Sequence, residues 1–345
     1  MYNSEISGEK MKLEINNNIK DTYPVYIEKG SINEIKKYIS FSHKNLLLTD
    51  DLVPTEYVQK ILAATDNVCV CTCLSGEVSK SFATYQSILQ VLFDNEFDKD
   101  DLLIALGGGV IGDLGGFVAS TYKRGMRFIN VPTTSLAMVD SSIGGKNGIN
   151  FLDIKNSIGS FYNPEMVIID VDVLKTLPQR HLVNGLIEAI KCGLIGDKGL
   201  FNLFKKLNGG DYDSLKPHLE EIIIRSLNVK KKVVEADLYD TNERRVLNFG
   251  HTYGHAIEAL NINDILHGEA VALGMLYVLN DDLKEELIEI LFKLGFKVDF
   301  TLLENEKIHN KIIHDKKIKN GKINLVKVDN VGKAYIEEVD IEKIK

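Results

Sequence analysis

The stretch "DLLIALGGGVIGDLGGF", residues 101–117, decides the expected fold. It opens with an apolar run of strand length, continues through glycines at 107–109 and ends in a segment of helical composition. A buried strand that leads through glycines into a helix is the repeating unit of a parallel sheet with crossover helices. We therefore predict an α/β architecture here, with backbone amides at the helix N-terminus available to a phosphate.

The lack of an acidic residue at the expected distance after these glycines argues against an ordinary Rossmann site. Gly107, Gly109 and Gly112 satisfy G-x-G-x-x-G, yet Arg127 lies about where an acidic residue should end the next strand. Ribose and adenine contacts would then come from other loops, such as "LTDD" (48–51) and "SGEVSKS" (75–81). A tight turn that binds no ligand is the structural alternative.

The pattern of hydrophobic residues changes near residue 175. Before it, short runs rich in valine, isoleucine and leucine alternate with helical stretches. After it, long segments of 3.6 periodicity dominate, and no clear strand follows until "KINLVKV" (322–328). We predict an α/β N-terminal domain with a largely parallel sheet at 1–175 and a mainly α-helical domain at 176–345. A cleft between such halves is the expected ligand position.

Composition limits the possible partners and compartment. The 345 residues include 44% hydrophobic residues, enough for a sizeable core. The net charge of -8 argues against nucleic acid and anionic membranes as partners. The polar N-terminus and the lack of a long apolar run predict a cytoplasmic protein. Cys69, Cys71 and Cys73 alternate as in a strand, which predicts buried thiols on one face rather than disulfides; a thiolate metal site is the alternative.

A second polar stretch, "VPTTSLAMVDSSIGGKNGINFLDIKN" (131–156), has more functional groups than a turn needs. Its candidates for ligand contact are Thr133, Thr134, Asp140, Ser141, Ser142, Lys146, Lys155 and Asn156. The two lysines lie near glycines and suit an anionic group, although solvated surface lysines are the plainer interpretation.

The stretch "NFGHTYGHAIEAL" (248–260) raises the question of a metal site. His251, His255 and Glu258 share one face of a helix, and His267 lies at the expected start of the next helix. Two histidines and a carboxylate would leave positions open for substrate, as in catalytic zinc sites. Packed core histidines are the alternative. Spacing leaves Glu258, Glu269 and Glu188 open as the carboxylate.

Five motifs in order along the chain resemble the 3-dehydroquinate synthase family. They are "GGGVIGD" (107–113), "PTTSLAMVDSSIGGK" (132–146), "NGLIEAIK" (184–191), "LNFGHTYGHAIE" (247–258) and "HGEAVALGM" (267–275). The resemblance implies NAD in the α/β domain, zinc or cobalt in the helical domain, and 3-deoxy-D-arabino-heptulosonate 7-phosphate between them. It implies transient oxidation, phosphate elimination, re-reduction and aldol closure to 3-dehydroquinate in the shikimate pathway.

The resemblance also implies roles for particular residues. The metal ligands would be Glu188, His251 and His267. NAD would contact Asp50, Glu77, Lys80, Gly108, Gly109, Val110, Asp113, Thr133, Thr134, Asp140, Ser141, Lys155, Asn156 and Thr176. Catalysis and substrate binding would use Lys146, Lys191, Lys230, Arg244, Asn248, His255, Asp140, Arg124 and Lys316, with Lys317 as the alternative to Lys316. The family counterpart of Arg124 reaches a neighbouring subunit, which implies a homodimer.

Some of these residues also discriminate between enzyme classes. Metal-dependent polyol dehydrogenases share the glycine loop and a metal trio but need no phosphate pocket, so Lys146, Arg244 and Asn248 argue against them. Sister cyclases that make inosose or valiolone rings share most catalytic parts, whereas Lys230 and Asn248 favour dehydroquinate synthase. A non-catalytic binding module would be expected to have lost a metal, lysine or glycine position. Counting back from His251, Arg244 and Asn248 share its face if that segment is helical.

Overall fold

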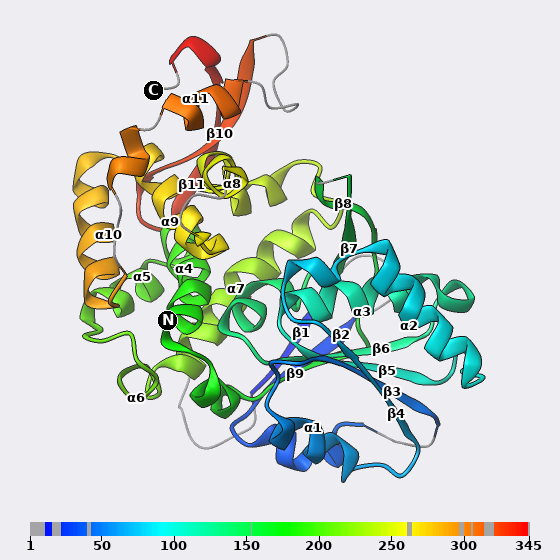
Figure 1. Cartoon of the computed structure of the whole chain (residues 1–345). Helices are drawn as coiled ribbons and strands as arrows, with labels where there is room; N and C mark the ends of the chain where they lie inside the picture. The colour runs from blue at the N-terminus through cyan, green and yellow to red at the C-terminus, as the bar shows by residue number, and fades with distance from the viewer. Residues whose placement is uncertain are drawn as a thin grey trace. The chain divides into compact units, whose positions relative to one another are not determined.

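The computed structural model describes residues 11–15, 22–39, 43–152, 154–260, 264–296, 300–304, 306–313 and 321–343. It divides into two compact units, Met1–Thr176 and Leu177–Lys345, which we call unit 1 and unit 2 and describe separately (Figure 1). Unit 1 contains a mostly parallel sheet and unit 2 is mainly helical, so the predicted fold class is confirmed. Among the described residues, no helix combines the length and apolarity that crossing a bilayer requires.

Unit 1 is built on a seven-stranded sheet with the order β1-β2-β9-β6-β5-β3-β4. The strands are β1 Met11–Ile15, β2 Tyr23–Ile27, β3 Asn45–Asp50, β4 Val68–Cys73, β5 Leu102–Gly107, β6 Arg127–Pro132 and β9 Met166–Ile169. β1 and β2 pair antiparallel, and the other neighbouring pairs are parallel. Every residue of β5 is buried, which explains its unbroken apolar sequence.

Helices cover both faces of this sheet. Figure 1 shows α1 (Thr55–Leu62) on the opposite face from α2 (Phe82–Asp94) and α3 (Gly109–Thr121). Leu103 and Ala105 of β5 pack in one core cluster with Ile88 of α2 and Leu114 of α3. Short helical turns complete unit 1: η1 Ser31–Lys37, η2 Glu77–Ser79, η3 Tyr122–Arg124, the π-helical η4 Ala137–Ser141 and η5 Val171–Thr176. The sheet and these helices place the polar loops at the ends of the strands.

A separate hairpin follows η4. It consists of β7 Lys146–Phe151 and β8 Ile154–Phe161, which pair antiparallel with Lys146 opposite Phe161. No strands were expected there, because polar residues interrupt the alternation that marks a half-buried strand. The hairpin carries several predicted site residues away from the main sheet.

The three cysteines of β4 differ in exposure. Cys73 is buried, but Cys69 and Cys71 are partly exposed, and all three are free thiols. The expectation of three buried side chains was therefore wrong for two of them. β4 is the edge strand of the sheet and has a neighbour on one side alone, which leaves its outer side chains less covered.

Unit 2 is arranged around α4 (Gln179–Gly196), in which every residue from 182 to 195 is buried. The surrounding helices are α5 Lys198–Lys206, α6 Tyr212–Leu215, α7 Leu219–Ala236, η6 Glu243–Asn248, α8 His251–Ala259, α9 His267–Val278, α10 Asp281–Lys293, η8 Phe300–Glu304 and α11 Glu306–Ile313. Pro178 is the N-cap residue of α4. A helix buried all round can carry charged side chains into the interior, and α4 does so at Glu188 and Lys191.

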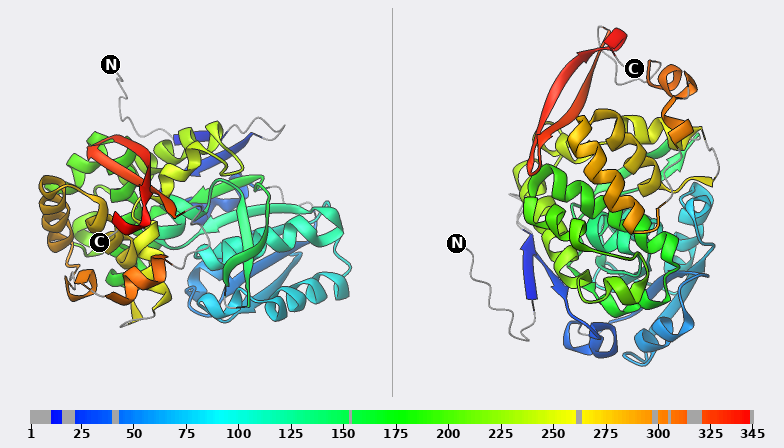
Figure 2. Two further views of the ribbon diagram at one scale, coloured as in Figure 1. Left: turned by 90° about the horizontal axis from the view of Figure 1, so that it is seen from above. Right: turned by 90° about the vertical axis from the view of Figure 1, so that its left-hand side faces the viewer.

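The C-terminal part of unit 2 is an antiparallel ribbon. It pairs β10 (Lys322–Asn330), the strand expected from the sequence, with β11 (Lys333–Asp340), and η9 (Ile341–Lys343) follows. β11 was not expected, because its side chains are mostly exposed and charged and show no clear apolar alternation. Figure 2 shows this ribbon projecting beyond the helices of unit 2.

Candidate active site

In unit 1, the glycine loop connects β5 to α3. β5 ends at Gly107, and Gly108 is the N-cap of α3, where no side chain caps the helix. Residues 108–110 are partly exposed. The backbone N–H of Thr133, at the end of β6, donates to Gly107 O over 2.9 Å and holds the two strand ends together. The first amides of α3, including that of Val110, can therefore bind a phosphate.

Close packing against the glycine loop brings two of the predicted hydroxyl side chains to it. A Cβ at Gly108 would lie 3.1 Å from Thr134 Cγ2, and a Cβ at Gly109 would lie 2.9 Å from Ser141 Oγ. Asp140 precedes Ser141 in η4. These glycines therefore serve close packing, and a phosphate site at the same loop stays a prediction.

A cluster of polar side chains in unit 1 centres on Lys80, which is 4% exposed. Its Nζ lies 2.7 Å from Asp113 Oδ2 and 3.9 Å from Glu77 Oε1, and it also donates to Asn156 Oδ1. Asn150 joins the cluster by donating to Glu77 Oε1 over 2.9 Å and accepting the Asn156 N–H over 2.9 Å. Four predicted residues from three separate stretches of the chain thus meet here, and Asn150 is an addition that the motifs did not indicate.

Other predicted residues of unit 1 are spread along the edges of its elements. Asp50 lies at the end of β3, where its carboxylate accepts the Leu52 and Val53 N–H groups, and burial raises its pKa. Thr176 donates to Val173 O over 2.9 Å at the end of η5. Each of these predicted groups thus also stabilises its own turn.

The two lysines of the polar stretch lie at opposite ends of the hairpin. Lys146 begins β7, whereas Lys155 lies near the start of β8, beside Asn156. The register places Ile154 opposite Phe151, so about four residues of β7, or about 14 Å, separate the levels of the two lysines. The two lysines therefore start from well-separated backbone positions along the hairpin.

Arg124 lies at the amino ends of the parallel strands, whereas the glycine loop lies at their carboxyl ends. α3 begins at the carboxyl end of β5 and runs for 13 residues, about 20 Å, before η3 leads into the amino end of β6. Lys123 and Arg124 have φ values of 46° and 66°, in the left-handed region that non-glycine residues rarely adopt. Unit 1 therefore does not bring Arg124 to its own glycine loop.

In unit 2, a buried carboxylate faces two histidines. The Nε2 atoms of His251 and His267 lie 3.7 Å and 3.5 Å from Oε1 of Glu188. Ligand atoms around a tetrahedral zinc ion with bonds of about 2.1 Å are about 3.4 Å apart. Glu188 is 1% exposed, and its other carboxylate oxygen, Oε2, pairs with Lys191. This donor set fits a divalent cation, and the three residues form a group that could hold one.

Asn184 positions His267 beside Glu188. Its Oδ1, one helical turn before Glu188 on α4, accepts the N–H groups of Gly268 over 2.8 Å and Glu269 over 3.3 Å. The side chain thereby caps α9, whose first residue is His267. A Cβ at Gly268 would lie 2.0 Å from Asn184 O, so glycine is needed for this close approach.

Glycines also set the crossing of α8 and α9. Gly250 has a φ of 76°, which turns the chain directly into α8 and places His251 at its first position. A Cβ at Gly274 would lie 1.9 Å from Gly250 O, so the two helices approach at backbone distance. The rings of His251 and His267 are consequently 5.3 Å apart, centroid to centroid.

The structure separates the three carboxylates that spacing left open. Glu188 faces both histidines through their Nε2 atoms. Glu269 instead pairs with Arg180 at 2.7 Å and 2.8 Å and accepts the Leu266 N–H. Glu258 lies 3.3 Å from Nδ1 of His267, on the other edge of that ring, and with His255 it forms a second group that could hold an ion.

Electrostatics around Glu188 favour an ionised carboxylate and a neutral His251. Burial opposes ionisation of Glu188, yet the paired Lys191 and the nearby histidines hold its pKa well below the usual range. Burial and the Lys191 charge lower the pKa of His251 to about 3, which leaves a lone pair for a metal. Burial also opposes protonation of His267, but hydrogen bonds with Glu188 and Glu258 raise its pKa to about 10. A cation bound at Nε2 would replace that proton.

The remaining predicted side chains of unit 2 differ in exposure. Lys230 on α7 and Arg244 in η6 are buried, whereas Asn248 and His255 are exposed. The ring of His255 lies 5.2 Å from that of His251. Phe249 and Gly250 separate η6 from α8, so Arg244, Asn248 and His251 do not share a continuous helix. The predicted Lys316 and its alternative Lys317 lie outside the described residues.

Asp237 organises the loop that holds Arg244. Its carboxylate accepts the N–H groups of Thr241 over 3.0 Å, Asn242 over 2.6 Å and Arg244 over 3.1 Å. Arg244 in turn donates from its guanidinium to Leu238 O over 2.7 Å. The motifs did not indicate Asp237, although an aspartate followed by a polar "YDTN" run (239–242) is typical of a carboxylate that binds turn amides.

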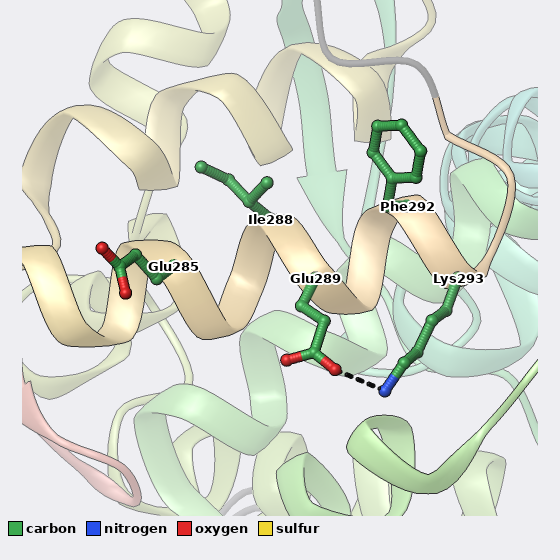
Figure 3. Close-up of a pocket in the computed structure, with 5 residues that line it drawn as sticks. All are labelled: Glu285, Ile288, Glu289, Phe292 and Lys293. Carbon is green, nitrogen blue, oxygen red and sulfur yellow. Dashed lines mark ion pairs between the residues drawn. The ribbon is translucent and has the colours of Figure 1, made fainter.

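A surface depression on α10 lies apart from these groups. Glu285, Ile288, Glu289, Phe292 and Lys293 line it, all from one helix (Figure 3). Phe292 is 74% exposed, and Glu289 pairs with Lys293 over 2.6 Å. None of the predicted site residues lines this depression, and it offers no convergent polar groups of the kind a substrate site needs.

Comparisons with known proteins identify the family of this chain. Residues 70–184 match the family model "3-dehydroquinate synthase N-terminal" and residues 185–318 match "3-dehydroquinate synthase C-terminal". A 3-dehydroquinate synthase of Streptococcus thermophilus is 39% identical over 97% of this chain and 99% of its own, and one of Clostridium beijerinckii is 40% identical over 93% and 96%.

Solved structures show the same fold. A 2-deoxy-scyllo-inosose synthase complexed with carbaglucose-6-phosphate, NAD+ and Co2+ superposes with a TM-score of 0.86 at 24% identity, over 96% of this chain and 97% of its own. At that identity the likeness concerns the fold alone. The two family models and the full-length relatives establish more: this chain belongs to the 3-dehydroquinate synthase family.

Proposed function

We propose that this protein is a 3-dehydroquinate synthase that depends on NAD and a divalent metal ion. It converts 3-deoxy-D-arabino-heptulosonate 7-phosphate to 3-dehydroquinate and phosphate. The observation that carries the proposal is the Glu188–His251–His267 group, preformed in a chain 39% identical to a 3-dehydroquinate synthase over nearly its whole length. Elimination of phosphate makes the reaction that of a lyase.

Unit 1 would bind NAD at the glycine loop. The uncapped first turn of α3 offers backbone amides to the pyrophosphate, and the hydroxyls of Thr134 and Ser141 lie against the same loop. The cluster around Lys80 would accept the cofactor's polar groups. An NAD+ molecule is present in the structure of the inosose synthase, which has the same fold.

Unit 2 would hold the metal ion, zinc or cobalt, through Glu188, His251 and His267. When bound, NAD supplies a hydride acceptor that is regenerated within each turnover, and the metal ion supplies polarisation of the reacting hydroxyl oxygen. Lys191 lies beside the proposed metal ligands, is 2% exposed and pairs with Glu188. His255 is exposed next to the cluster and can exchange a proton with bound substrate.

Cationic and amide side chains would bind the anionic substrate. Lys230 and Arg244 are buried cationic side chains of unit 2, and Asn248 is an exposed amide three residues before His251. Lys146, Asn156 and Lys316 complete the proposed phosphate contacts. Such pre-organised cations stabilise the negative charge that develops on the leaving phosphate.

We also propose that the enzyme is a homodimer in which Arg124 serves a neighbouring copy. The support is that Arg124 lies at the amino ends of the strands, away from the glycine loop of its own chain, in a segment with two residues at positive φ. Mixed-subunit activity tests this: inactive His251→Ala and inactive Arg124→Ala chains, mixed after dissociation, should regain part of the activity. A monomeric enzyme would regain none.

Product analysis tests the main proposal. Purified protein incubated with the heptulosonate phosphate, NAD and Zn2+ or Co2+ should release phosphate and yield a carbocyclic acid with the mass and NMR spectrum of 3-dehydroquinate. A chelator or the His251→Ala substitution should abolish the product. If instead a simple polyol is oxidised and the sugar phosphate stays intact, the chain is a polyol dehydrogenase and the proposal is wrong.

A further inference from the structure

We propose that Glu258 is a positioning residue that holds the ring of His267 with its Nε2 lone pair directed at the metal ion. The inference rests on the proposed function, because it assumes that Glu188, His251 and His267 bind a divalent cation. It adds a residue outside that donor set, placed two helical turns after His251 on α8.

The contacts of His267 define the role. Nδ1 lies 3.3 Å from Glu258 Oε2, while Nε2 lies 3.5 Å from Glu188 Oε1. The two nitrogens of an imidazole point away from each other, so these carboxylates lie at opposite edges of the ring. If Nδ1 carries the proton and donates it to Glu258, Nε2 is left as a neutral donor atom that faces Glu188.

His251 has the same arrangement with a different acceptor. Its Nδ1 lies 3.0 Å from Phe249 O, and its Nε2 lies 3.7 Å from Glu188 Oε1. Both histidines therefore have an oxygen at Nδ1 and present Nε2 to the same carboxylate oxygen. Metal-bound histidines usually donate their second N–H to a carbonyl or a carboxylate in this way, which sets the tautomer and the ring orientation.

The position of His267 explains why it needs a side-chain partner. His251 lies in the turn formed by Phe249 and Gly250, where a backbone carbonyl is within reach of its Nδ1. His267 is the first residue of α9, its side chain is 30% exposed, and Nδ1 points toward α8. Glu258 is 17% exposed, so water screens the contact less than at the surface.

Glu258 could alternatively be a ligand of a second ion, since His255, Glu258 and His267 also form a group of suitable size. That arrangement would use Nδ1 of His267 as a donor atom while Nε2 binds the first ion. The imidazole would then have to lose both protons, which is far less favourable than keeping one proton in a hydrogen bond to a carboxylate. The geometry therefore favours the positioning role.

The test is the affinity of the purified full-length protein for Zn2+ and Co2+, measured by competition with a chromophoric chelator. Glu258→Ala should bind each metal about 10–100-fold more weakly than the parent. Glu258→Gln keeps an acceptor oxygen without the charge and should fall between the two. Glu289→Ala, which removes an exposed glutamate paired with Lys293 on α10, is the matched control and should leave the affinity unchanged.

A structural defect and a positioning defect give different results. If Glu258 orients His267, the visible absorption spectrum of bound Co2+ should change in Glu258→Ala and be largely restored in Glu258→Gln, with the parent thermal stability of the metal-free protein retained in both. The stoichiometry should be one ion per chain in every variant.

Three outcomes would overturn the inference. Unchanged metal affinity and Co2+ spectrum in Glu258→Ala would show that Glu258 does not position His267, while the proposed function would stand. Loss of one of two bound ions would make Glu258 a ligand. A parent protein that binds neither metal would remove the basis of this inference and of the metal-dependent function together.

Discussion

In the glycine loop of unit 1 the proposed binding groups belong mainly to the backbone, whereas in the proposed metal site of unit 2 they belong to side chains on three helices. The polar groups around Lys80 already pair with one another, so that cluster is satisfied within the protein. Glu188, by contrast, is almost fully buried, pairs with Lys191 through Oε2 and directs Oε1 at His251 and His267. We therefore expect the stability of unit 2 to depend more strongly on its buried charges than the stability of unit 1 depends on the Lys80 cluster.

We expect the largest effect on stability from removing one member of the buried Glu188–Lys191 pair in unit 2. Glu188→Leu leaves the Lys191 charge buried without its partner and should lower the free energy of unfolding of the chelator-treated protein by about 3–5 kcal/mol. Urea unfolding measures this. The Glu188→Leu/Lys191→Met double variant should recover most of the loss, and a single variant as stable as the parent would contradict the account.

The equivalent change in unit 1 should have a smaller effect. Lys80→Met removes the partner of Asp113, but Asp113 is 20% exposed and can be hydrated, so we expect a loss of about 1–3 kcal/mol in the free energy of unfolding. The same urea titration compares the two pairs directly. A loss from Lys80→Met as large as that from Glu188→Leu would mean that the two clusters do not differ in the proposed way.

Substituting glycines of α3 distinguishes a role in NAD binding from a role in core packing within unit 1. Gly109→Ala places a Cβ 2.9 Å from Ser141 Oγ beside the proposed NAD loop and should weaken NAD binding about tenfold, with metal affinity unchanged. Gly115→Ala, whose Cβ would lie 3.1 Å from Ala105 Cβ in the core, is the matched control. Calorimetric titration with NAD should show normal affinity for that variant despite a lower melting temperature. Equal loss of NAD affinity in both would point to general disruption of α3.

The smallest expected effect concerns Asp237 and the loop of Arg244. Partial burial opposes its ionisation, yet the backbone N–H groups of Thr241, Asn242 and Arg244 lower its pKa to about 2. Because the folded-state pKa lies below the unfolded value near 3.9, the carboxylate contributes stability above about pH 4 that is lost as the pH falls toward 2.

Asp237→Asn should therefore cost about 1 kcal/mol at neutral pH and almost nothing near pH 2. Denaturant unfolding at several pH values measures the difference between variant and parent. A difference that stays constant from neutral to acid pH would show that the charge of Asp237 does not hold this loop.

Continuous motifs made much of the fold and of the site predictable. The run from 101 to 117 predicted β5, the glycine loop and α3, because local spacing alone determines that arrangement. The position of His267 at the start of α9 also followed from its sequence context. The cofactor and substrate roles of the individual residues, including Lys146 and Lys155, stay predictions.

Contacts between distant segments were not predictable. Asn184 caps α9 across 84 positions of the chain, and no spacing rule links an asparagine on one helix to the amides of another. The same holds for Asn150, whose partner Glu77 lies 73 positions away. Spacing placed Glu258 with His251 and His255 on one face. Spacing alone could not show that Glu188, rather than Glu258, faces the Nε2 atoms of both His251 and His267, because that depends on how three helices pack.

The most direct test of the central claim is the ratio of phosphate released to NADH formed when purified protein acts on the heptulosonate phosphate with limiting NAD and saturating metal. Because the proposed reaction regenerates NAD in each turnover, we expect many phosphates released per NAD and no net NADH. Phosphate release should be lost in Glu188→Gln and in the presence of a chelator. NADH that accumulates in step with substrate consumption, or phosphate release that persists without NAD, would contradict it.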